Sequence, residues 1–452
     1  MNGVETTTTL RSSAGAGKTR FYRIAVDGSR LVRVAWTEGR TPRETVVECD
    51  SEREAARESA KLRGKKLREG FAYVADAERA AHGDVVFDVQ VPNRCSAEAF
   101  DLSPDGRTLV VGTMLREAYG AELHLIDVGT GERRLVHAEA VAPTGEGAGG
   151  PTQTFLHAAL FDATGTRLVY AMNGETRLLD LGSGETQVLA RYEEFADARF
   201  NPFRLRPALD AARRRLLLFD AGDRVRVLGP ERSDGGASQA SGAWGRDPLF
   251  ETGTARPGFE CWAAGLSPSG RLLALCFSRG SRYRADDPQV TEVEIWDVDR
   301  GVELCRIPMG RPAYVVGFDP SETELVAAVE FADGPCAFSV ETGRLLWHFP
   351  DPFRDDRWAT CYGWAYSPDG GTLAIGRRGE TEVVDAATRR ADPAFAPIPG
   401  DAGTGRTRTV RFSADGGLMA AGGDSGRIIL RRRCGPGPAS APATAPAPPG
   451  TR

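Results

Sequence analysis

Histidine is scarce in this chain, and its cysteines lack the spacing of metal ligands. Only five histidines occur in 452 residues, and none of the eight cysteines belongs to a Cys-x-x-Cys pair. Structural zinc sites require cysteine or histidine ligands at short, regular spacing. We therefore expect neither a metal nor another cofactor. Because several cysteines lie in apolar, strand-like segments, we interpret them as small buried side chains.

Catalytic signatures are also missing from the sequence. It contains no Gly-x-Ser-x-Gly segment, no His-Glu-x-x-His segment and no pair of carboxylates in a distinctive context. The stretch RSSAGAGKTR, residues 11–20, resembles a phosphate-binding loop only at its end, because Ser12 stands where that loop requires glycine. The residues after it alternate between apolar and polar, which predicts a strand instead of the required helix. We therefore expect a protein that is not an enzyme.

Long hydrophobic runs are absent too. No run approaches the about 20 apolar residues that a membrane-spanning helix needs, and the first residues lack the charged and then apolar segment of a secretory signal. We expect a soluble, cytoplasmic protein with no membrane contact. The formal net charge of −5 does not favour nucleic acid as a partner of the whole molecule, and the length favours two domains or one large β architecture.

A repeated pattern occupies most of the chain. Each copy has an apolar strand, a tight turn of Ser, Asp, Pro or Gly residues, and a second apolar strand. A further hairpin follows most copies, such as LHLIDVGTGERRLV after the first, so that each unit supplies four short antiparallel strands. Seven copies occur, at residues 100–111, 160–171, 208–219, 265–276, 317–328, 365–376 and 411–422.

The copies recur every 46–60 residues, and this period with four strands per unit is typical of a β-propeller. The segments resemble WD repeats, most clearly at Trp296-Asp297, although the Gly-His dipeptide of that family is absent. We predict a mostly β protein with a seven-bladed propeller over residues 84–434. Six or eight blades are the alternatives, because the third unit, residues 208–231, lacks an obvious outer strand.

The last copy supplies only three strands, so another strand is needed to close the ring without an unpaired edge. Residues 84–91 have the right length and pattern, and we predict that they pair with residues 427–432. Insertions at residues 139–153, 229–258 and 279–291 are rich in Gly, Ser and Arg and are expected to be loops. The chain then becomes rich in Pro and Ala, so residues 435–452 are predicted to be disordered.

Residues 18–76 do not follow the repeat and predict a small α+β domain behind a flexible leader, residues 1–17. Three strand-like segments precede a helix, whose start is marked by Ser51 as N-cap and Glu54 three residues later. Gly70 ends the helix, and FAYV returns as a strand. The segments FYRIAVDGSRLVRVAW and CDSEREAARESAKLRGKKLREGF, in this order and spacing, resemble the WGR domain of poly(ADP-ribose) polymerases and many bacterial proteins.

The Trp-Gly-Arg signature of that family is altered here. Trp36 is followed by Thr37 and Glu38, and a Gly-Arg pair arrives two residues late, ending at Arg40. A carboxylate at the position of the family's arginine argues against a phosphate contact there. A literal Trp-Gly-Arg begins at Trp244, but it lies in a Gly/Ser-rich insertion, and we interpret it as a coincidence.

The N-terminal module is the basic part of the chain. Residues 18–75 hold fourteen Lys and Arg against nine Asp and Glu, a formal charge of +5. In the polymerases the WGR domain helps to bind DNA, so the resemblance implies a contact surface on this module. The candidate contact residues are Trp36, Arg40, Lys61, Lys65 and Arg68, of which the last three share one helix face at i, i+4, i+7 spacing.

These features favour a non-enzymatic scaffold in which a propeller face binds a protein partner. The first alternative is a nucleic-acid-binding regulator that contacts DNA or RNA through the WGR-like module. The second is a propeller enzyme, which a deep channel lined by clustered carboxylates or histidines would favour. The Ala-, Arg- and Gly-rich composition suits a bacterial source.

Overall fold

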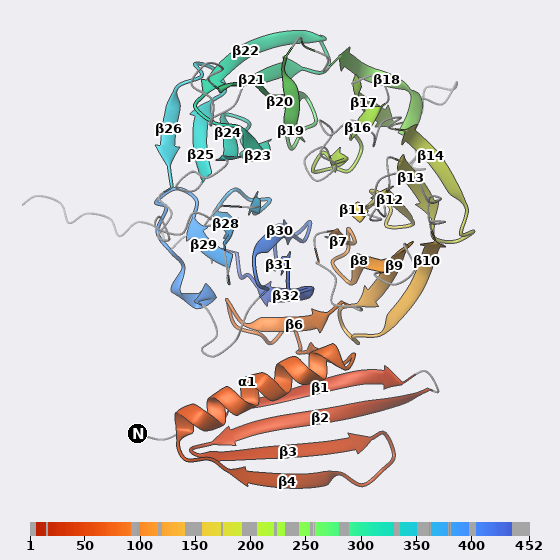
Figure 1. The fold of residues 1–452 in the computed structure, drawn as a ribbon, viewed down its shortest axis with the longest axis vertical. Helices are drawn as coiled ribbons and strands as arrows, with labels where there is room; N and C mark the ends of the chain where they lie inside the picture. Colours follow the sequence, from red (N-terminus) through yellow and green to blue (C-terminus); the bar gives the residue numbers. More distant parts are fainter. Residues whose placement is uncertain are drawn as a thin grey trace, which may run out of the picture.

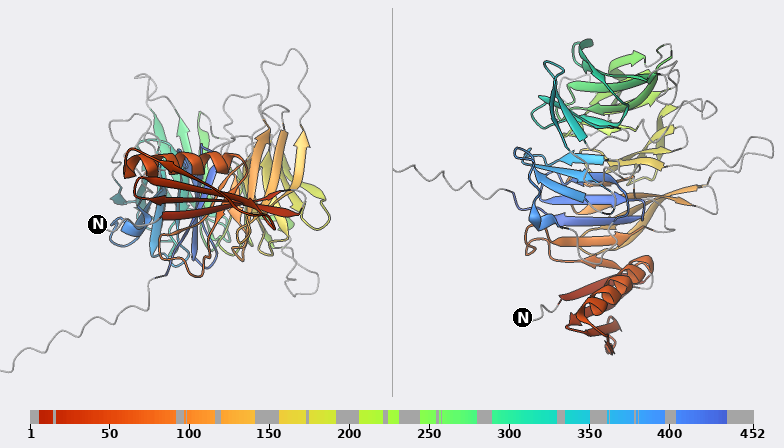
Figure 2. Two further views of the ribbon diagram at one scale, coloured as in Figure 1. Left: turned by 90° about the horizontal axis from the view of Figure 1, so that it is seen from below. Right: turned by 60° about the vertical axis from the view of Figure 1, so that its left-hand side comes forward.

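The computed structural model shows a ring of small sheets with a helix-covered sheet attached at one side (Figures 1 and 2). The ring has a β-propeller arrangement, and the attached part contains the N-terminal strands and the helix. The structure describes residues 6–14, 17–91, 97, 99–115, 120–140, 156–172, 175–191, 206–220, 224–230, 244–253, 256, 258–279, 289–329, 335–349, 361, 363–377, 379, 381–396 and 404–435.

The N-terminal part is an antiparallel sheet with a helix on one face. Its elements are β1 (Thr6–Ala14), β2 (Lys18–Asp27), β3 (Arg30–Thr37), β4 (Arg43–Glu48), α1 (Glu52–Arg68) and β5 (Ala72–Val74). Alternate residues of a strand point to opposite faces, so Ile24 and Val26 share the face that α1 covers. Ala55 and Leu67 of the helix complete this core with Phe71.

Helix α1 begins where the sequence predicts. Ser51 is its N-cap, and the Ser51 Oγ accepts a hydrogen bond from the Glu54 N–H at 3.2 Å. The Glu54 carboxylate accepts in return from the Asp50 N–H at 2.8 Å. Such caps satisfy N–H groups that the first helical turn leaves without partners, and each contributes about 1 kcal/mol. The helix ends before Gly70, whose φ of 86° is a left-handed conformation that favours glycine.

The flexible leader predicted for residues 1–17 is wrong over residues 6–14. These residues form β1, which pairs antiparallel with β2 from Thr6 opposite Val26 to Ala14 opposite Lys18. Four consecutive threonines favour a strand, because β-branched side chains fit a pleated sheet. Leu10 anchors β1 in the core under α1, where its side chain is fully buried. The segment RSSAGAGKTR therefore joins two strands and lacks the helix of a phosphate-binding loop.

Six separate sheets form the propeller arrangement, rather than the seven separate blades predicted. Five sheets have four strands and one has three, and every strand pairs with its neighbours in the chain. The first three sheets contain β7 (Phe100–Leu102), β8 (Thr108–Leu115), β9 (Gly120–Asp127) and β10 (Arg133–Ala140); β11 (Leu156–Phe161), β12 (Arg167–Met172), β13 (Glu175–Asp180) and β14 (Thr186–Arg191); and β15 (Ala208–Leu209), β16 (Leu216–Asp220), β17 (Arg224–Pro230) and β18 (Trp244–Gly253).

The other three sheets complete this set. They contain β19 (Glu260–Leu266), β20 (Leu272–Arg279), β21 (Val290–Asp297) and β22 (Val302–Met309); β23 (Ala313–Phe318), β24 (Glu324–Val329), β25 (Pro335–Ser339) and β26 (Leu345–His348); and β27 (Gly363–Tyr366), β28 (Thr372–Gly376) and β29 (Thr381–Asp385). A short 3-10 helix, η2 (Pro393–Phe395), follows β29. Apolar residues of adjacent sheets pack together in shared clusters, so each sheet covers the face of the next.

The last repeat belongs to a nine-stranded sheet that runs from the ring into the N-terminal part. Its order is β30-β31-β32-β6-β5-β1-β2-β3-β4, with β6 (Val85–Gln90), β30 (Thr407–Phe412), β31 (Leu418–Gly423) and β32 (Arg427–Arg432). The predicted pairing of residues 84–91 with residues 427–432 is present as β6 on β32. Because β5 pairs with the other side of β6, this sheet does not stand as a separate blade, which explains the lower count.

All seven repeated segments form the same hairpin turn. The first turn residue is Ser or Asp, and its side chain accepts a hydrogen bond from the N–H five residues later, at 2.7–3.2 Å. Short polar side chains make such bonds readily, which is why they dominate tight turns. The accepting residues are Ser103, Asp162, Asp210, Ser267, Asp319, Ser367 and Ser413.

A buried ion triad attaches the N-terminal part to the ring. Asp88 of β6 is fully buried and lies between two guanidinium groups. Arg427 of β32 donates to it from Nε at 2.7 Å, and Arg63 of α1 donates from Nη2 at 2.7 Å. The Arg63 guanidinium also lies 5.3 Å from the centre of the Tyr73 ring. One carboxylate therefore connects the helix, the shared sheet and the last repeat.

The third unit has an outer strand that its sequence does not reveal. Residues 229–258 are predicted to be a loop, yet Trp244–Gly253 within them forms β18 and pairs with β17. Two shifts of register and Pro248 interrupt the alternation by which a strand is recognised. An outer strand tolerates proline because only one of its sides must be paired. The Trp-Gly-Arg at Trp244 therefore begins a strand instead of lying in a loop.

Several predicted segments lie outside the described residues. The insertion at 139–153 is described only at its first two residues, which end β10, and that at 279–291 only at Arg279 and from residue 289 onward. The Pro/Ala-rich segment 435–452 is described only at Gly435.

Candidate functional site

Trp36, the first predicted contact residue, lies on the sheet face opposite α1. It stands across from Phe21 on β2, and the two rings stack with their centres 5.0 Å apart. Both side chains are half-buried, while Val34 on the same face is buried. The stacked pair lies near the end of β3 and leaves a partly exposed aromatic surface.

Arg40 is exposed in the turn after β3, where its N–H donates to the Thr37 carbonyl at 2.8 Å. Glu38, the carboxylate two residues after Trp36, holds the end of the β2–β3 hairpin. Its N–H donates to the Thr19 carbonyl at 2.8 Å, and its carboxylate accepts from the Thr19 N–H at 3.3 Å. Glu38 therefore has a structural role in this turn.

The basic residues predicted to share a face of α1, namely Lys61, Lys65 and Arg68, are all exposed. Two of them have acidic neighbours on the helix. The Lys61 Nζ lies 2.6 Å from Glu58 Oε1, and the Lys65 Nζ lies 4.0 Å from Glu69 Oε1. Water screens exposed pairs of this kind, so they contribute little to stability. The three basic side chains form a cationic surface on α1, and the carboxylates of Glu58 and Glu69 balance part of its charge.

The five predicted residues do not form one surface. Helix α1 covers one face of the N-terminal sheet (Figure 2). The strand pairing places Trp36 on the opposite face. Two further basic residues of the helix turn inward: Arg63 binds Asp88, and the Lys66 Nζ lies 4.5 Å from the centre of the Tyr22 ring. A ligand that lies along the exposed helix face therefore does not reach Trp36.

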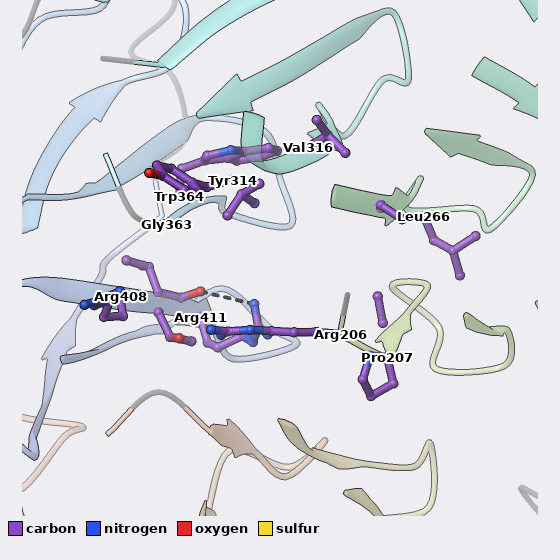
Figure 3. A pocket seen from close by; sticks show the side chains of 15 residues that line it. Arg206, Pro207, Leu266, Tyr314, Val316, Gly363, Trp364, Arg408 and Arg411 are labelled. Atoms are coloured by element: carbon purple, nitrogen blue, oxygen red, sulfur yellow. Dashed lines mark hydrogen bonds between the residues drawn. The ribbon is translucent and has the colours of Figure 1, made fainter. Parts of the chain in front are cut away.

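Inner strands of five sheets meet at the centre of the ring (Figure 1). Their residues line a cavity of about 500 Å³ (Figure 3). These strands are β15, β19, β23, β27 and β30. Glycines allow them to approach closely: a Cβ at Gly265 would lie 2.2 Å from the Val316 carbonyl oxygen. We call this the axial cavity. Its polar side chains are Arg206, Tyr314, Trp364, Arg408, Thr409 and Arg411.

The described lining of the axial cavity carries positive charge. This lining includes three arginines and no carboxylate or histidine. Arg408 pairs with Asp424 outside the lining, at 2.7 Å. Arg411 makes one long contact of 3.5 Å to the Val410 carbonyl oxygen. Burial lowers the pKa of Arg411, against the opposing effect of Asp101, and the positive charges of Arg206 and Arg213 lower it further.

Asp101, which lies near Arg411, is already engaged by other groups. Arg213 donates to both of its oxygens, at 2.5 and 3.2 Å, and the Phe161 N–H donates to it at 3.0 Å. Arg213 has a φ of 56°, where the equivalent residue of five other repeats is glycine. Such a conformation costs a non-glycine residue about 1 kcal/mol. Arg213 holds Asp101 from this turn, and Arg411 forms no ion pair with a carboxylate among the described residues.

Aromatic and apolar side chains form the other side of the axial cavity. Trp364 and Tyr314 lie across from Arg206 and Arg411, and Leu266 and Val316 extend this wall (Figure 3). The Trp364 Nε1–H is buried and has no acceptor among the described residues. A buried donor without a partner costs about 1–3 kcal/mol and is rare in native proteins.

Sequence reasoning missed this cavity because its residues come from strands far apart in the chain. One signal was available in the repeats. Two positions before the first turn residue, five copies have small or apolar residues, while the first has Asp101 and the last has Arg411. A charge at an inner-strand position that is otherwise small or apolar marks a residue with a role beyond packing.

The described residues offer little other chemistry. No three His, Cys, Asp or Glu side chains among them are grouped so that they could hold a metal ion. Within this part of the chain, no helix is long and apolar enough to cross a membrane. In comparisons with known proteins, the chain matches no family model and no curated protein.

Proposed function

We propose that this protein is a non-enzymatic interaction scaffold whose propeller binds a protein partner. The continuous nine-stranded sheet is the observation that supports this function best, because it joins the ring and the N-terminal part into one body. The buried Asp88 triad reinforces that junction. Two separate surfaces held at a fixed distance suit the simultaneous binding of two partners. The described lining of the axial cavity has neither carboxylate nor histidine, which gives no support to a propeller enzyme.

Site-specific photo-crosslinking of the full chain tests this function. Benzoylphenylalanine is placed at Tyr314 on the axial cavity, at Lys65 on α1, or at the exposed Val188 on the outer strand β14 as a control. In cells of the source organism, we expect a discrete protein adduct at Tyr314 that the Val188 control lacks. Identical adduct patterns at all three positions would contradict a specific scaffold.

A nucleic-acid contact through the N-terminal module is a second candidate. It is supported by the exposure of Lys61, Lys65 and Arg68 on one face of α1, and by the order of strands and helix that resembles the WGR domain. Each phosphate contact releases counterions, so three such contacts give an affinity that falls steeply with salt, with a logarithmic slope of about −2.7 on duplex DNA.

Fluorescence anisotropy with a labelled duplex and a labelled single strand tests this candidate. Changing Lys61, Lys65 and Arg68 to Glu is expected to abolish binding and its salt dependence. The matched control changes three exposed arginines of the propeller, Arg134, Arg271 and Arg344, to Glu, with the same change in net charge. Equal losses in both triple variants would show that net charge alone is responsible, and no binding at low salt would exclude the contact.

A further inference from the structure

We propose that the axial cavity binds an acidic segment of the partner protein, in which a carboxylate side chain is followed closely by an apolar one. This inference rests on the proposed scaffold function and specifies the chemistry of its partner. The carboxylate would lie against Arg411 and Arg206, and the apolar side chain against Trp364 and Leu266.

Arg411 is the side chain of the cavity that calls for an anion. Arg206 and Arg411 are close enough for each charge to oppose the other, and both face a space walled by protein. Asp101 is held by Arg213, and Asp424 by Arg408, and Arg411 forms an ion pair with neither carboxylate. Guanidinium groups bind carboxylates through two parallel hydrogen bonds, and such bonds strengthen where water is excluded. A bound carboxylate would compensate the buried charge of Arg411.

The opposite wall selects a ligand with an apolar part. Trp364, Leu266 and Val316 give a surface that would not attract a small hydrated anion. The buried Trp364 Nε1–H needs an acceptor, and a peptide carbonyl oxygen supplies one. An extended peptide carries carboxylates, apolar side chains and backbone carbonyls within a few residues. The volume of about 500 Å³ falls within the range of natural ligand pockets.

Binding of labelled peptides to the full-length protein tests the proposal. The probe is a 12-residue peptide of alternating Glu and Leu pairs with a fluorescent end, compared with the same peptide in which Gln replaces every Glu. We expect the Glu peptide to bind at least tenfold more tightly than the Gln peptide, because a charge-assisted hydrogen bond is about twice as strong as a neutral one. Equal affinities would overturn the proposal.

Variants locate the site. Arg411→Gln is expected to weaken the Glu peptide about tenfold or more, while Arg134→Gln, the same change on the exposed strand β10, leaves its affinity unchanged. Circular dichroism verifies the fold of each variant. If Arg411→Gln does not fold, benzoylphenylalanine at Leu266 provides the second measurement, and we expect it to crosslink the Glu peptide alone. Unchanged affinity in a folded Arg411→Gln protein, or no crosslink at Leu266, would refute the site.

Competition separates a protein segment from a small anion. Inorganic phosphate and free glutamate are expected to displace the Glu peptide only at concentrations at least 100-fold above its dissociation constant. Displacement at similar concentrations would reassign the cavity to a small anion and overturn the peptide proposal. If the photo-crosslinking at Tyr314 gives a partner adduct while the Glu peptide does not bind, the scaffold function stands and only the acidic specificity fails.

Discussion

Replacing Asp88 with Ala should weaken the junction between the ring and the N-terminal part more than any surface change. The variant leaves Arg427, whose side chain is 8% exposed, and Arg63, which is 15% exposed, as neighbouring cations without their carboxylate. Removing one partner from a buried ion pair typically costs about 3–5 kcal/mol, because the remaining charge is not solvated. All three groups are buried well enough for this figure to apply.

Hydrogen exchange followed by mass spectrometry measures the effect where it occurs. A loss of about 3–5 kcal/mol corresponds to faster exchange by roughly 100-fold or more in β6 and β32, at about 1.4 kcal/mol for each tenfold change. The control is Asp76→Ala, which breaks the exposed pair with Arg79 nearby and should stay within about 0.5 kcal/mol of the wild type.

A triple variant tests whether the unsolvated arginine charges cause the loss of stability. Arg63→Met, Asp88→Leu and Arg427→Met together replace the ion triad with apolar side chains of similar size, and buried triads exchanged in this way are often neutral or more stable. We therefore expect the triple variant to recover most of the protection that Asp88→Ala loses. Exchange in Asp88→Ala within tenfold of the wild type, or a triple variant as labile as the single one, would refute the reasoning.

Three further predictions concern the ring. Burial raises the pKa of Asp369, but hydrogen bonds from Ser367 and Arg433 outweigh this effect and lower the pKa from 3.8 to about 2. The free energy of unfolding should therefore fall as the pH drops from about 4 to 2, and it should fall less in Asp369→Asn. Acid titration followed by circular dichroism measures both. Iodoacetamide mapping should label the exposed Cys434 early and Cys336 only after denaturation, because burial raises the Cys336 pKa to about 12. Ser413→Ala leaves the Leu418 N–H without its acceptor and should cost about 1–2 kcal/mol in urea unfolding, whereas Ser413→Thr should cost less.

The sequence was informative wherever structure is local. The Ser51 cap and the seven turns could be predicted, because turn chemistry acts over a few residues. The pairing of residues 84–91 with residues 427–432 is long-range, and it was predicted because the ring needs a strand to cover its unpaired edge. Strand β18 was not predicted, because Pro248 and two register shifts interrupt its alternation of apolar and polar residues. Strand β1 was not predicted, because its polar run of threonines was interpreted as a flexible leader. Pairing with β2 makes this segment a strand.

Local sequence patterns could not predict the candidate site. Trp36 and the basic helix face were predicted as one contact surface, and only the pairing of β2 with β3 shows that they lie on opposite sides. Arg206, Trp364 and Arg411 meet because the ring closes, and closure depends on every intervening repeat. The predicted number of separate blades was wrong for the same reason, because β5 pairs with β6 through contacts that no repeat encodes.

The nine-stranded sheet that joins the ring to the N-terminal part also determines when this protein can finish folding during synthesis. Asp88 and its partner Arg427 are 339 residues apart, so β6 emerges from the ribosome long before the strand it pairs with. Pairings of such long range form late and expose an unpaired edge until they do. A nascent or truncated chain that lacks β32 would present the open edge of β6 to chaperones and proteases, because the strand that covers this edge is the last of the ring to be synthesised.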